Sequence, residues 1–359
     1  MGSKTTLRDV ARVAGVSPAT VTRLATGTYR VSPAVAERVR NAAAKLGVDL
    51  QRTKKAIAIG FLLSNREMLH PFHSRILAGV EAYCAAREHY VLFLPYRYLF
   101  NTPWGELHVP QVWRRRDIVC GFIVAGVNSQ NLLELLSHEE IPFAVLGNNV
   151  TGEWRHEEYD VVYFDDIEGS YEVTRYLQML GHRDIWFVAN CQLSWFARRY
   201  EGYRRAMLEV GLTPRLSETD SDKGAELGYL ATKSVLARGE PVSAIFAGDD
   251  PTAQGVYKAL DGHGLRIPED VSVVGFSDVE GELLHPPLTT VRAFPEQVGK
   301  HLAQQLLNRV LDPDLAPQHY TMPTQLVVRA SCRPLFPAPG SQDEARPQAN
   351  KREAVGSSP

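Results

Sequence analysis

Several polar side chains follow apolar segments that have the length and composition of buried strands. His73 comes after the first such segment, Asp249 after a later one, and Ser277 and Asp278 after a third. In open α/β sheets, ligands bind at the carboxyl ends of parallel strands. Carboxylate, hydroxyl and imidazole groups at that edge suit a small polar ligand.

Arg199 and two aromatic residues fit the same chemistry. A guanidinium donates hydrogen bonds in a fixed fork, which together with nearby carboxylates suits the neighbouring hydroxyls of a carbohydrate. Phe72 or Trp195 could stack on the face of a sugar ring. The alternative role for these residues is helix capping and hydrogen bonding between lobes, which applies to Arg199, to Asp278 and to Asp250, the neighbour of Asp249.

The sequence lacks the common signatures of catalysis. It has no GxGxxG after a strand, no GxxxxGK[ST], no GxSxG and no HExxH. Its four cysteines are far apart and without metal-ligand spacing, which indicates buried thiols. We therefore expect no enzyme, no cofactor and no metal site. A solute receptor of the transport type is the alternative binding function.

A second group of residues, near the N-terminus, predicts three short helices. Thr6 lies three residues before Asp9, the spacing of a capping box, and Gly15 permits a sharp turn after the first helix. Ser17-Pro18 and Ser32-Pro33 each set an N-cap before a proline at the first helical position. Two helices joined by a tight turn, with a third packed across them, form a helix-turn-helix unit.

The charge of the chain is segregated. Residues 1–55 contain 11 Lys and Arg against 3 Asp and Glu, a balance of +8. The rest contains 28 against 38, or −10, and the two parts give the net −2 of the whole chain. Positive charge concentrated in one terminal module favours contact with DNA phosphates. A helical bundle with no nucleic-acid role would leave this segregation unexplained.

The run LRDVARVAGVSPATVTR resembles the N-terminal DNA-binding domain of the lactose/galactose repressor (LacI/GalR) family of bacterial transcription regulators. Further segments resemble the effector domain of that family, which is similar to periplasmic sugar-binding proteins. The resemblance covers about residues 5–333 and includes the runs Arg199–Tyr203, Ile267–Phe276 and Pro286–Val291.

The resemblance implies roles for individual residues of the second helix. Pro18, Ala19 and Arg23 fall at base-reading positions, where Arg23 can donate two bonds to a guanine edge. Pro18 and Ala19 can make only apolar contacts, for instance to a thymine methyl. Helix capping is the alternative for the hydroxyl residues. The other expected DNA contacts are Thr6, Leu7, Ser17, Thr20, Thr22, Thr26 and Arg30.

The resemblance also places Arg199 where the family faces a sugar from the cleft. Ser277 departs from the pattern, since many sugar-responsive relatives carry Asp there, and Gly147–Asn149 has no acidic residue. Both departures leave room for an effector other than a simple hexose. The expected effector-binding residues are Phe72, His73, Trp195, Arg199, Asp249, Ser277 and Asp278.

From Ala56 onward, apolar strands alternate with helices, which predicts doubly wound parallel sheets. Their number is too large for one sheet, so we expect an α/β domain of two lobes, similar to periplasmic binding proteins, after a small all-α helix-turn-helix domain. The predicted boundaries are 1–47 for the DNA-binding domain, 48–55 for a linker, 56–333 for the two-lobed effector and dimerisation domain, and 334–359 for a disordered tail.

The linker is short. In the family, the segment after the third helix forms a hinge helix on DNA, and a leucine in it enters the minor groove. Here the segment is roughly half a dozen residues shorter, nearly two turns of helix. Leu50, beside Asp49, is its only wedge candidate. We expect nearly straight DNA and control through a taut tether, the alternative being that Leu50 replaces the missing wedge.

No apolar run approaches the length of a membrane span, and the N-terminus lacks the apolar core of a signal peptide. We therefore expect a cytoplasmic transcription regulator controlled by a small effector, most simply a sugar or sugar derivative. A homodimer should bind a pseudo-palindromic operator in double-stranded DNA. Repression or activation, and pairing of dimers into tetramers, stay open.

Overall fold

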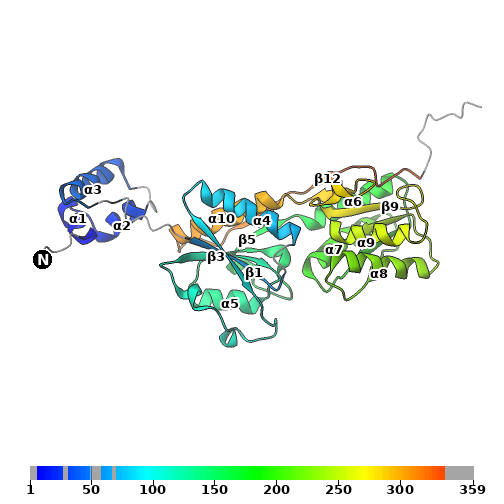
Figure 1. Cartoon of the computed structure of the whole chain (residues 1–359), viewed down its shortest axis with the longest axis horizontal. Coiled ribbons are helices and arrows are strands. Elements are labelled where there is room, and N and C mark those ends of the chain that lie inside the picture. The colour runs from blue at the N-terminus through cyan, green and yellow to red at the C-terminus, as the bar shows by residue number, and fades with distance from the viewer. Residues whose placement is uncertain (1–5, 27–30, 49, 51–57, 67–69, 336–359) are drawn as a thin grey trace, which may run out of the picture.

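The computed structural model describes residues 6–26, 31–48, 50, 58–66 and 70–335 of the 359-residue chain. The N-terminal part forms three helices, α1 (Leu7–Ala14), α2 (Pro18–Thr26) and α3 (Pro33–Lys45). Val10, Val21 and Val39 are fully buried in the small core between them. Figure 1 shows these helices as a separate unit at the N-terminal end of the molecule.

Three of the four residues predicted to begin or end the N-terminal helices act as predicted. The Asp9 carboxylate accepts hydrogen bonds from the Thr6 backbone N–H at 2.9 Å and from the Thr6 hydroxyl at 2.8 Å. Gly15 follows α1 with φ of 65°. Ser17 Oγ accepts the Thr20 N–H at 3.1 Å, which caps α2. Ser32 occupies the N-cap of α3, but its side chain makes no capping hydrogen bond.

The first lobe is built on a six-stranded parallel sheet with the order β11-β5-β4-β3-β1-β2. Every residue of β1 and β3 is buried, as the apolar runs predicted. Its strands are β1 (Ala58–Ser64), β2 (Tyr90–Tyr96), β3 (Val119–Gly126), β4 (Phe143–Leu146), β5 (Asp160–Phe164) and β11 (His319–Met322), and its helices are α4 (Pro71–Ala85), α5 (Gln130–His138) and α10 (Pro295–Leu311).

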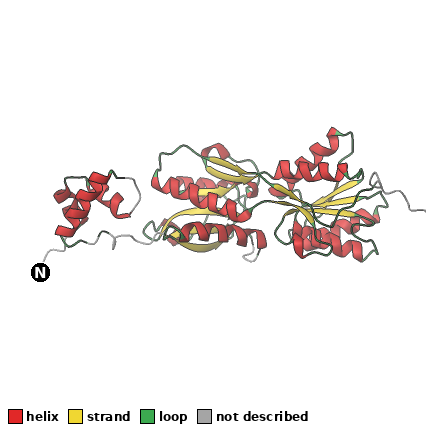
Figure 2. Ribbon diagram, turned by 90° about the horizontal axis from the view of Figure 1, so that it is seen from above, coloured by secondary structure: helices red, strands yellow, loops and turns green. Residues whose placement is uncertain are grey.

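The second lobe repeats the design with the order β12-β10-β9-β8-β6-β7, in which only β12 is antiparallel to its neighbour. Figure 2 shows helices on both faces of each sheet. The strands are β6 (Ile185–Ala189), β7 (Arg215–Glu218), β8 (Ala244–Ala247), β9 (Ser272–Ser277), β10 (Thr289–Arg292) and β12 (Gln325–Val327), and the helices are α6 (Asp166–Met179), α7 (Ser194–Glu209), α8 (Gly224–Ala237) and α9 (Asp250–Asp261).

The chain passes between the lobes three times, after β5, β10 and β11. The first and third crossings are tied to each other, because Asp165 donates its N–H to the Met322 carbonyl at 2.9 Å and Thr324 Oγ1 donates to the Asp165 carbonyl at 3.1 Å. The second crossing begins beside the third, since Arg292 at the end of β10 pairs with Gln325 of β12. Three crossings side by side form the connection about which two lobes can move.

Helices α4 and α10 of the first lobe pack backbone against backbone. A Cβ added at Gly79 would lie 1.9 Å from the Glu296 carbonyl oxygen, and one at Gly299 would lie 2.1 Å from the Ile76 carbonyl oxygen. Only glycine permits such an approach. The two helices therefore behave as one unit, and any side chain larger than glycine at either position would force them apart.

Candidate effector site and nucleic-acid interface

A cavity lies between the two lobes. The first lobe contributes the start of α4 and the turn after β4, and the second lobe contributes α7 and the carboxyl ends of β8 and β9. The lining residues are Arg66, His70, Pro71, Phe72, His73, Asn149, Trp195, Arg199, Asp249, Pro251, Ser277 and Val279.

The structure brings together six of the seven residues expected to bind an effector. Asp278 is the exception, because it is not among the lining residues. The six that line the cavity are Phe72, His73, Trp195, Arg199, Asp249 and Ser277.

Arg199 supplies a buried cation to the cavity. Its Nη1 donates to the Gly248 carbonyl at 2.7 Å, and its guanidinium carbon lies 4.1 Å from the ring centre of Phe276. Its Nε has no hydrogen-bond partner among the described residues. Burial lowers the pKa of Arg199, while the carboxylates of Asp166 and Asp249 oppose that shift, so the side chain stays charged. A ligand that offers an oxygen to this group would satisfy a buried donor.

His73 is buried as a neutral imidazole. Burial, with smaller contributions from the charges of His70 and Arg66, lowers the pKa of His73 well below its usual value. Its Nε2 lies 3.1 Å from Asn149 Nδ2, and its Nδ1 has no partner in the described part of the chain. The pair can donate to or accept from a ligand hydroxyl without adding charge.

Aromatic side chains form the apolar walls. Phe72 and Trp195 are both buried, and Phe72 contacts Phe164 edge-on with ring centres 5.5 Å apart. The guanidinium of Arg66 lies 4.5 Å from the ring centre of Trp195, so a first-lobe cation rests on a second-lobe ring. Rings beside convergent polar groups are the composition that small-molecule sites share.

Asp249 is only partly available to a ligand. Its Oδ1 accepts the Thr252 N–H at 2.8 Å and the Thr252 hydroxyl at 2.6 Å, which caps α9. The capping role considered for such carboxylates therefore occupies Oδ1 of Asp249, a residue that also lines the cavity.

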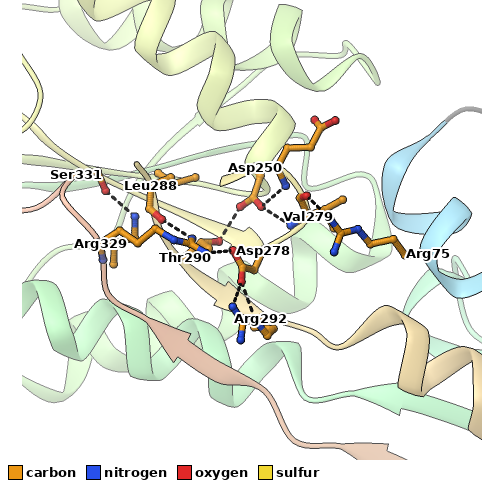
Figure 3. A network of polar contacts seen from close by, with 11 residues as sticks. Arg75, Asp250, Asp278, Val279, Leu288, Thr290, Arg292, Arg329 and Ser331 are labelled. Carbon is orange, nitrogen blue, oxygen red and sulfur yellow. Dashed lines mark hydrogen bonds and ion pairs between the residues drawn. The ribbon is translucent and has the colours of Figure 1, made fainter. Parts of the chain in front are cut away.

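Asp278 lies in an ion-pair cluster instead of the cavity (Figure 3). Arg292 Nε donates to its Oδ2 at 2.7 Å, and Arg329 Nη2 lies 2.7 Å from its Oδ1. Ser277 and Asp278 have φ of 101° and 53°, values that cost non-glycine residues about 1–3 kcal/mol each. Asp278 was predicted to bind the effector. In the structure its carboxylate is instead paired with Arg292 and Arg329, and these ion pairs hold its own loop in place.

Asp250 anchors the same loop from the start of α9 (Figure 3). Its Oδ2 accepts the Val279 N–H at 2.8 Å, and its Oδ1 accepts the Thr290 hydroxyl at 2.7 Å. It is fully buried, and burial raises its pKa to about 7. Asp250 does not line the cavity, and its hydrogen bonds stay within the second lobe, so the alternative of bonding between lobes does not hold for it.

Two lining residues that bear strongly on the site were not expected from the sequence. Arg66 follows β1 by two residues and Asn149 ends the turn after β4, so both obey the rule that ligands bind at strand ends. Gly147–Asn149 stood out in the sequence only for lacking an acidic residue, whereas the strand-end rule applied to β4 selects Asn149 as a ligand contact. No group of three or more His, Cys, Asp or Glu that could hold a metal occurs among the described residues.

The candidate DNA surface is the start of α2. Ser17, Pro18 and Ala19 are exposed there, whereas Val21 on the same helix is fully buried. Exposed small side chains at this end allow a close approach to base edges. Leu7 is partly buried against the three-helix core. The side chains of Arg23 and Thr26, and all of Arg30, lie outside the described residues.

Local hydrogen bonds engage several of the hydroxyls predicted to contact phosphate. Ser17 Oγ and Thr20 Oγ1 are 2.8 Å apart, and Thr22 Oγ1 donates to the Pro18 carbonyl at 3.0 Å. Thr6 is bonded to Asp9. Each hydroxyl oxygen keeps acceptor capacity, but the capping and intrahelical roles weighed for these residues are present.

Leu50, the wedge candidate, packs against the three-helix core together with Val48. The rest of the linker, Asp49 and residues 51–55, lies outside the described residues. In this arrangement Leu50 belongs to the helical module instead of projecting from it.

Known proteins resemble both the helical module and the two-lobed domain. Residues 6–48 match bacterial regulatory proteins of the lacI family, and residues 174–332 match a periplasmic binding protein-like domain. The HTH-type transcriptional repressor PurR of Vibrio cholerae is 31% identical over 352 residues, covering 92% of this chain and 98% of the relative. PurR of Vibrio campbellii is 30% identical, covering 92% and 99%.

Solved structures of regulators of this type have a similar fold. A complex of the transcriptional regulator CelR with cellobiose has a TM-score of 0.68 at 27% identity, covering 91% of this chain and 100% of that one. A LacI family regulator from Enterococcus faecium with bound ribose has a TM-score of 0.66 at 26% identity, covering 78% and 100%. The Lac repressor dimer bound to operator shares the fold, with a TM-score of 0.66 at 23% identity, covering 92% and 100%.

Proposed function

Because this chain belongs to the lacI family of bacterial regulatory proteins, a family of DNA-binding transcription regulators and not of enzymes, we propose that it is a repressor whose operator binding is controlled by a sugar or sugar derivative in the interlobe cavity. The observation that carries the proposal is the cavity itself, where Arg199, Asp249 and His73 face buried aromatic rings. Such a site recognises hydroxyl groups by hydrogen bonds and a ring face by stacking.

Related proteins support the choice of ligand class, since CelR is seen with cellobiose and an Enterococcus faecium relative with ribose. The charged side chains that line the cavity are Arg66, Arg199 and Asp249, and its neutral polar side chains, among them Asn149 and Ser277, suit the hydroxyls of a ligand. Ser277, where relatives often have Asp, offers a hydroxyl instead of a charge, so we infer a hydroxylated ligand other than a simple hexose.

A gel-shift with genomic fragments, followed by a sugar screen on the retained fragment, tests the whole proposal. We expect specific retention and a change in retention on addition of one sugar. If only apolar or nucleobase-like compounds changed retention, the sugar assignment would be wrong while the regulator assignment stood.

For the DNA side we propose that Arg23 reads a guanine edge and that Pro18 and Ala19 contact bases. Thr6, Leu7, Ser17, Thr20, Thr22, Thr26 and Arg30 would contact the backbone, together with the basic charge of the module.

Arg23→Ala should weaken operator binding by roughly 1–3 kcal/mol and leave non-specific, salt-sensitive binding nearly intact. A bidentate base contact discriminates between sequences, whereas phosphate contacts do not. Footprinting titrations on operator and random DNA measure the difference. Equal losses on the two DNAs would remove Arg23 from the base-reading set.

Leu50→Ala should leave the shape of bound DNA unchanged, and that DNA should be nearly straight. Leu50 packs against the core of its own module, and the linker is too short for a stable isolated helix. Fluorescence transfer between the ends of a bound operator reports the bend. A sharp central kink in the wild type that vanishes in the variant would contradict the tether hypothesis.

We further propose a cytoplasmic homodimer on a pseudo-palindromic operator, with domain boundaries at 47, 55 and 333. Helices of the described part of the chain are all too short or too polar to cross a membrane. Closure of the lobes about the three crossings would change how two helical modules are spaced.

A further inference from the structure

Two side chains reach across the cleft and donate to a backbone carbonyl of the other lobe. Arg75 on α4 donates from Nη2 to the Val279 carbonyl at 2.8 Å, and Ser194 at the start of α7 donates from Oγ to the Asn148 carbonyl at 2.9 Å. Val279 lines the cavity, and Asn148 precedes the lining residue Asn149. Both contacts therefore depend on how the cavity walls are arranged.

At its first-lobe end the Arg75 side chain also contacts α10 through a half-exposed ion pair. Arg75 Nη1 lies 3.6 Å from Glu296 Oε1 on α10. Glu296 is also the residue whose carbonyl would touch a Cβ at Gly79 of α4. Arg75 thus lies one turn from a point where the backbones of α4 and α10 are in close contact. A displacement of its guanidinium therefore affects both helices.

The second-lobe end is fixed more strongly (Figure 3). The Val279 N–H is bound by Asp250, and Asp250 also binds Thr290 of β10. One residue earlier, Asp278 is held by Arg292 and Arg329. The loop 277–280 is therefore tied to α9, to β10 and to the segment after β12, in a backbone conformation that it would not adopt unaided.

We infer that Arg75 is a positioning residue that couples the cavity to the first lobe, through the loop whose Ser277 and Val279 face the ligand space. The inference rests on the proposed function in that it takes the cavity as the effector site. A ligand that contacts Ser277 or Val279 alters the carbonyl that Arg75 holds, and Arg75 passes that change to α4 and α10. Ser194 makes a comparable interlobe bond on the α7 side, but its carbonyl partner is not part of this loop.

Hydrogen-exchange mass spectrometry on the full chain, without added ligand or DNA, tests the coupling. In Arg75→Met, peptides covering 277–283 and 70–78 should exchange faster, by on the order of tenfold, because the bond joining them is lost. Arg75→Lys should restore part of the protection. Ser194→Ala, which removes the other interlobe bond, should leave peptide 277–283 as in the wild type.

The control for general destabilisation is Arg87→Met, just beyond α4, whose guanidinium contacts only Tyr83 among its described polar and ring partners. The melting midpoint of Arg75→Met should match that of Arg87→Met. Unchanged exchange at 277–283 in Arg75→Met, equal acceleration in Ser194→Ala, or faster exchange throughout both lobes would each overturn the inference. None of these outcomes depends on the identity of the effector, so a failed sugar assignment would be separately visible.

Discussion

Arg199→Ala should abolish the thermal stabilisation that the effector gives, with affinity falling by a factor of roughly 30 or more. Arg199 is buried, its Nε is unpaired among the described residues, and it faces the cavity. Truncating one partner of a buried charged hydrogen bond costs about 2–5 kcal/mol. A thermal-shift screen of sugars on the wild type, repeated on the variant with each hit, measures the loss.

Arg204→Ala is the matched control, because Arg204 lies on the same helix α7 but is exposed and paired with Glu201. It should respond to the hit like the wild type. A hit that stabilises the Arg199 variant fully would remove this residue from the binding site. The melting midpoint of each variant without ligand separates lost binding from lost folding, since Arg199 also faces the buried carboxylate of Asp166.

The free energy of unfolding of Asp250→Asn, minus that of the wild type, should increase by roughly 2–3 kcal/mol when the pH is raised from 5 to 8. Burial raises the pKa of Asp250 to about 7 in the folded protein. Between pH 5 and 7 an unfolded chain has already lost this proton, while the folded chain keeps it. Raising the pH therefore destabilises the wild type until the folded pKa is passed, and asparagine removes that dependence.

Chemical denaturation of both proteins at pH 5 and pH 8 gives the difference in their free energies of unfolding at each pH. Asp261→Asn, an exposed carboxylate at the other end of α9, is the control and should follow the wild type at both values. An asparagine amide in place of Asp250 cannot accept from both Val279 and Thr290 as the carboxyl does, but that loss is the same at both pH values and cancels in the comparison. Parallel behaviour of Asp250→Asn and wild type would show that the carboxyl ionises in its usual range.

The order and type of the elements were largely readable from the sequence, because buried parallel strands are continuous apolar runs and the helices of the N-terminal module begin at capping residues or prolines. The strands that escaped prediction are β7 and β11. Arg215–Glu218 and His319–Met322 are short, polar and at or near sheet edges, with few buried side chains. Edge strands of this kind carry little hydrophobic signal. The antiparallel pairing of β12 was equally invisible, since it depends on where the third crossing returns the chain.

The candidate site was predictable where the strand-end rule applies and unpredictable where partners come from far along the chain. That rule located Asp249 and Ser277, and the resemblance located Arg199. Neither the rule nor the resemblance could reveal that Asp278 is held by Arg292 and by Arg329, which lies 51 positions after Asp278. Nor could spacing reveal the bond from Arg75 to Val279, which joins residues separated by 204 positions.

The position of β11 in the first sheet has a consequence for synthesis. This strand pairs with β5, and α10 packs on β3, β4 and β5, yet both elements follow almost the whole second lobe in the chain. On a ribosome the second lobe is therefore nearly complete while the first still lacks its edge strand and one covering helix. Neither lobe corresponds to a continuous gene segment, so the DNA-binding module leaves the ribosome long before the domain that would control it has finished folding.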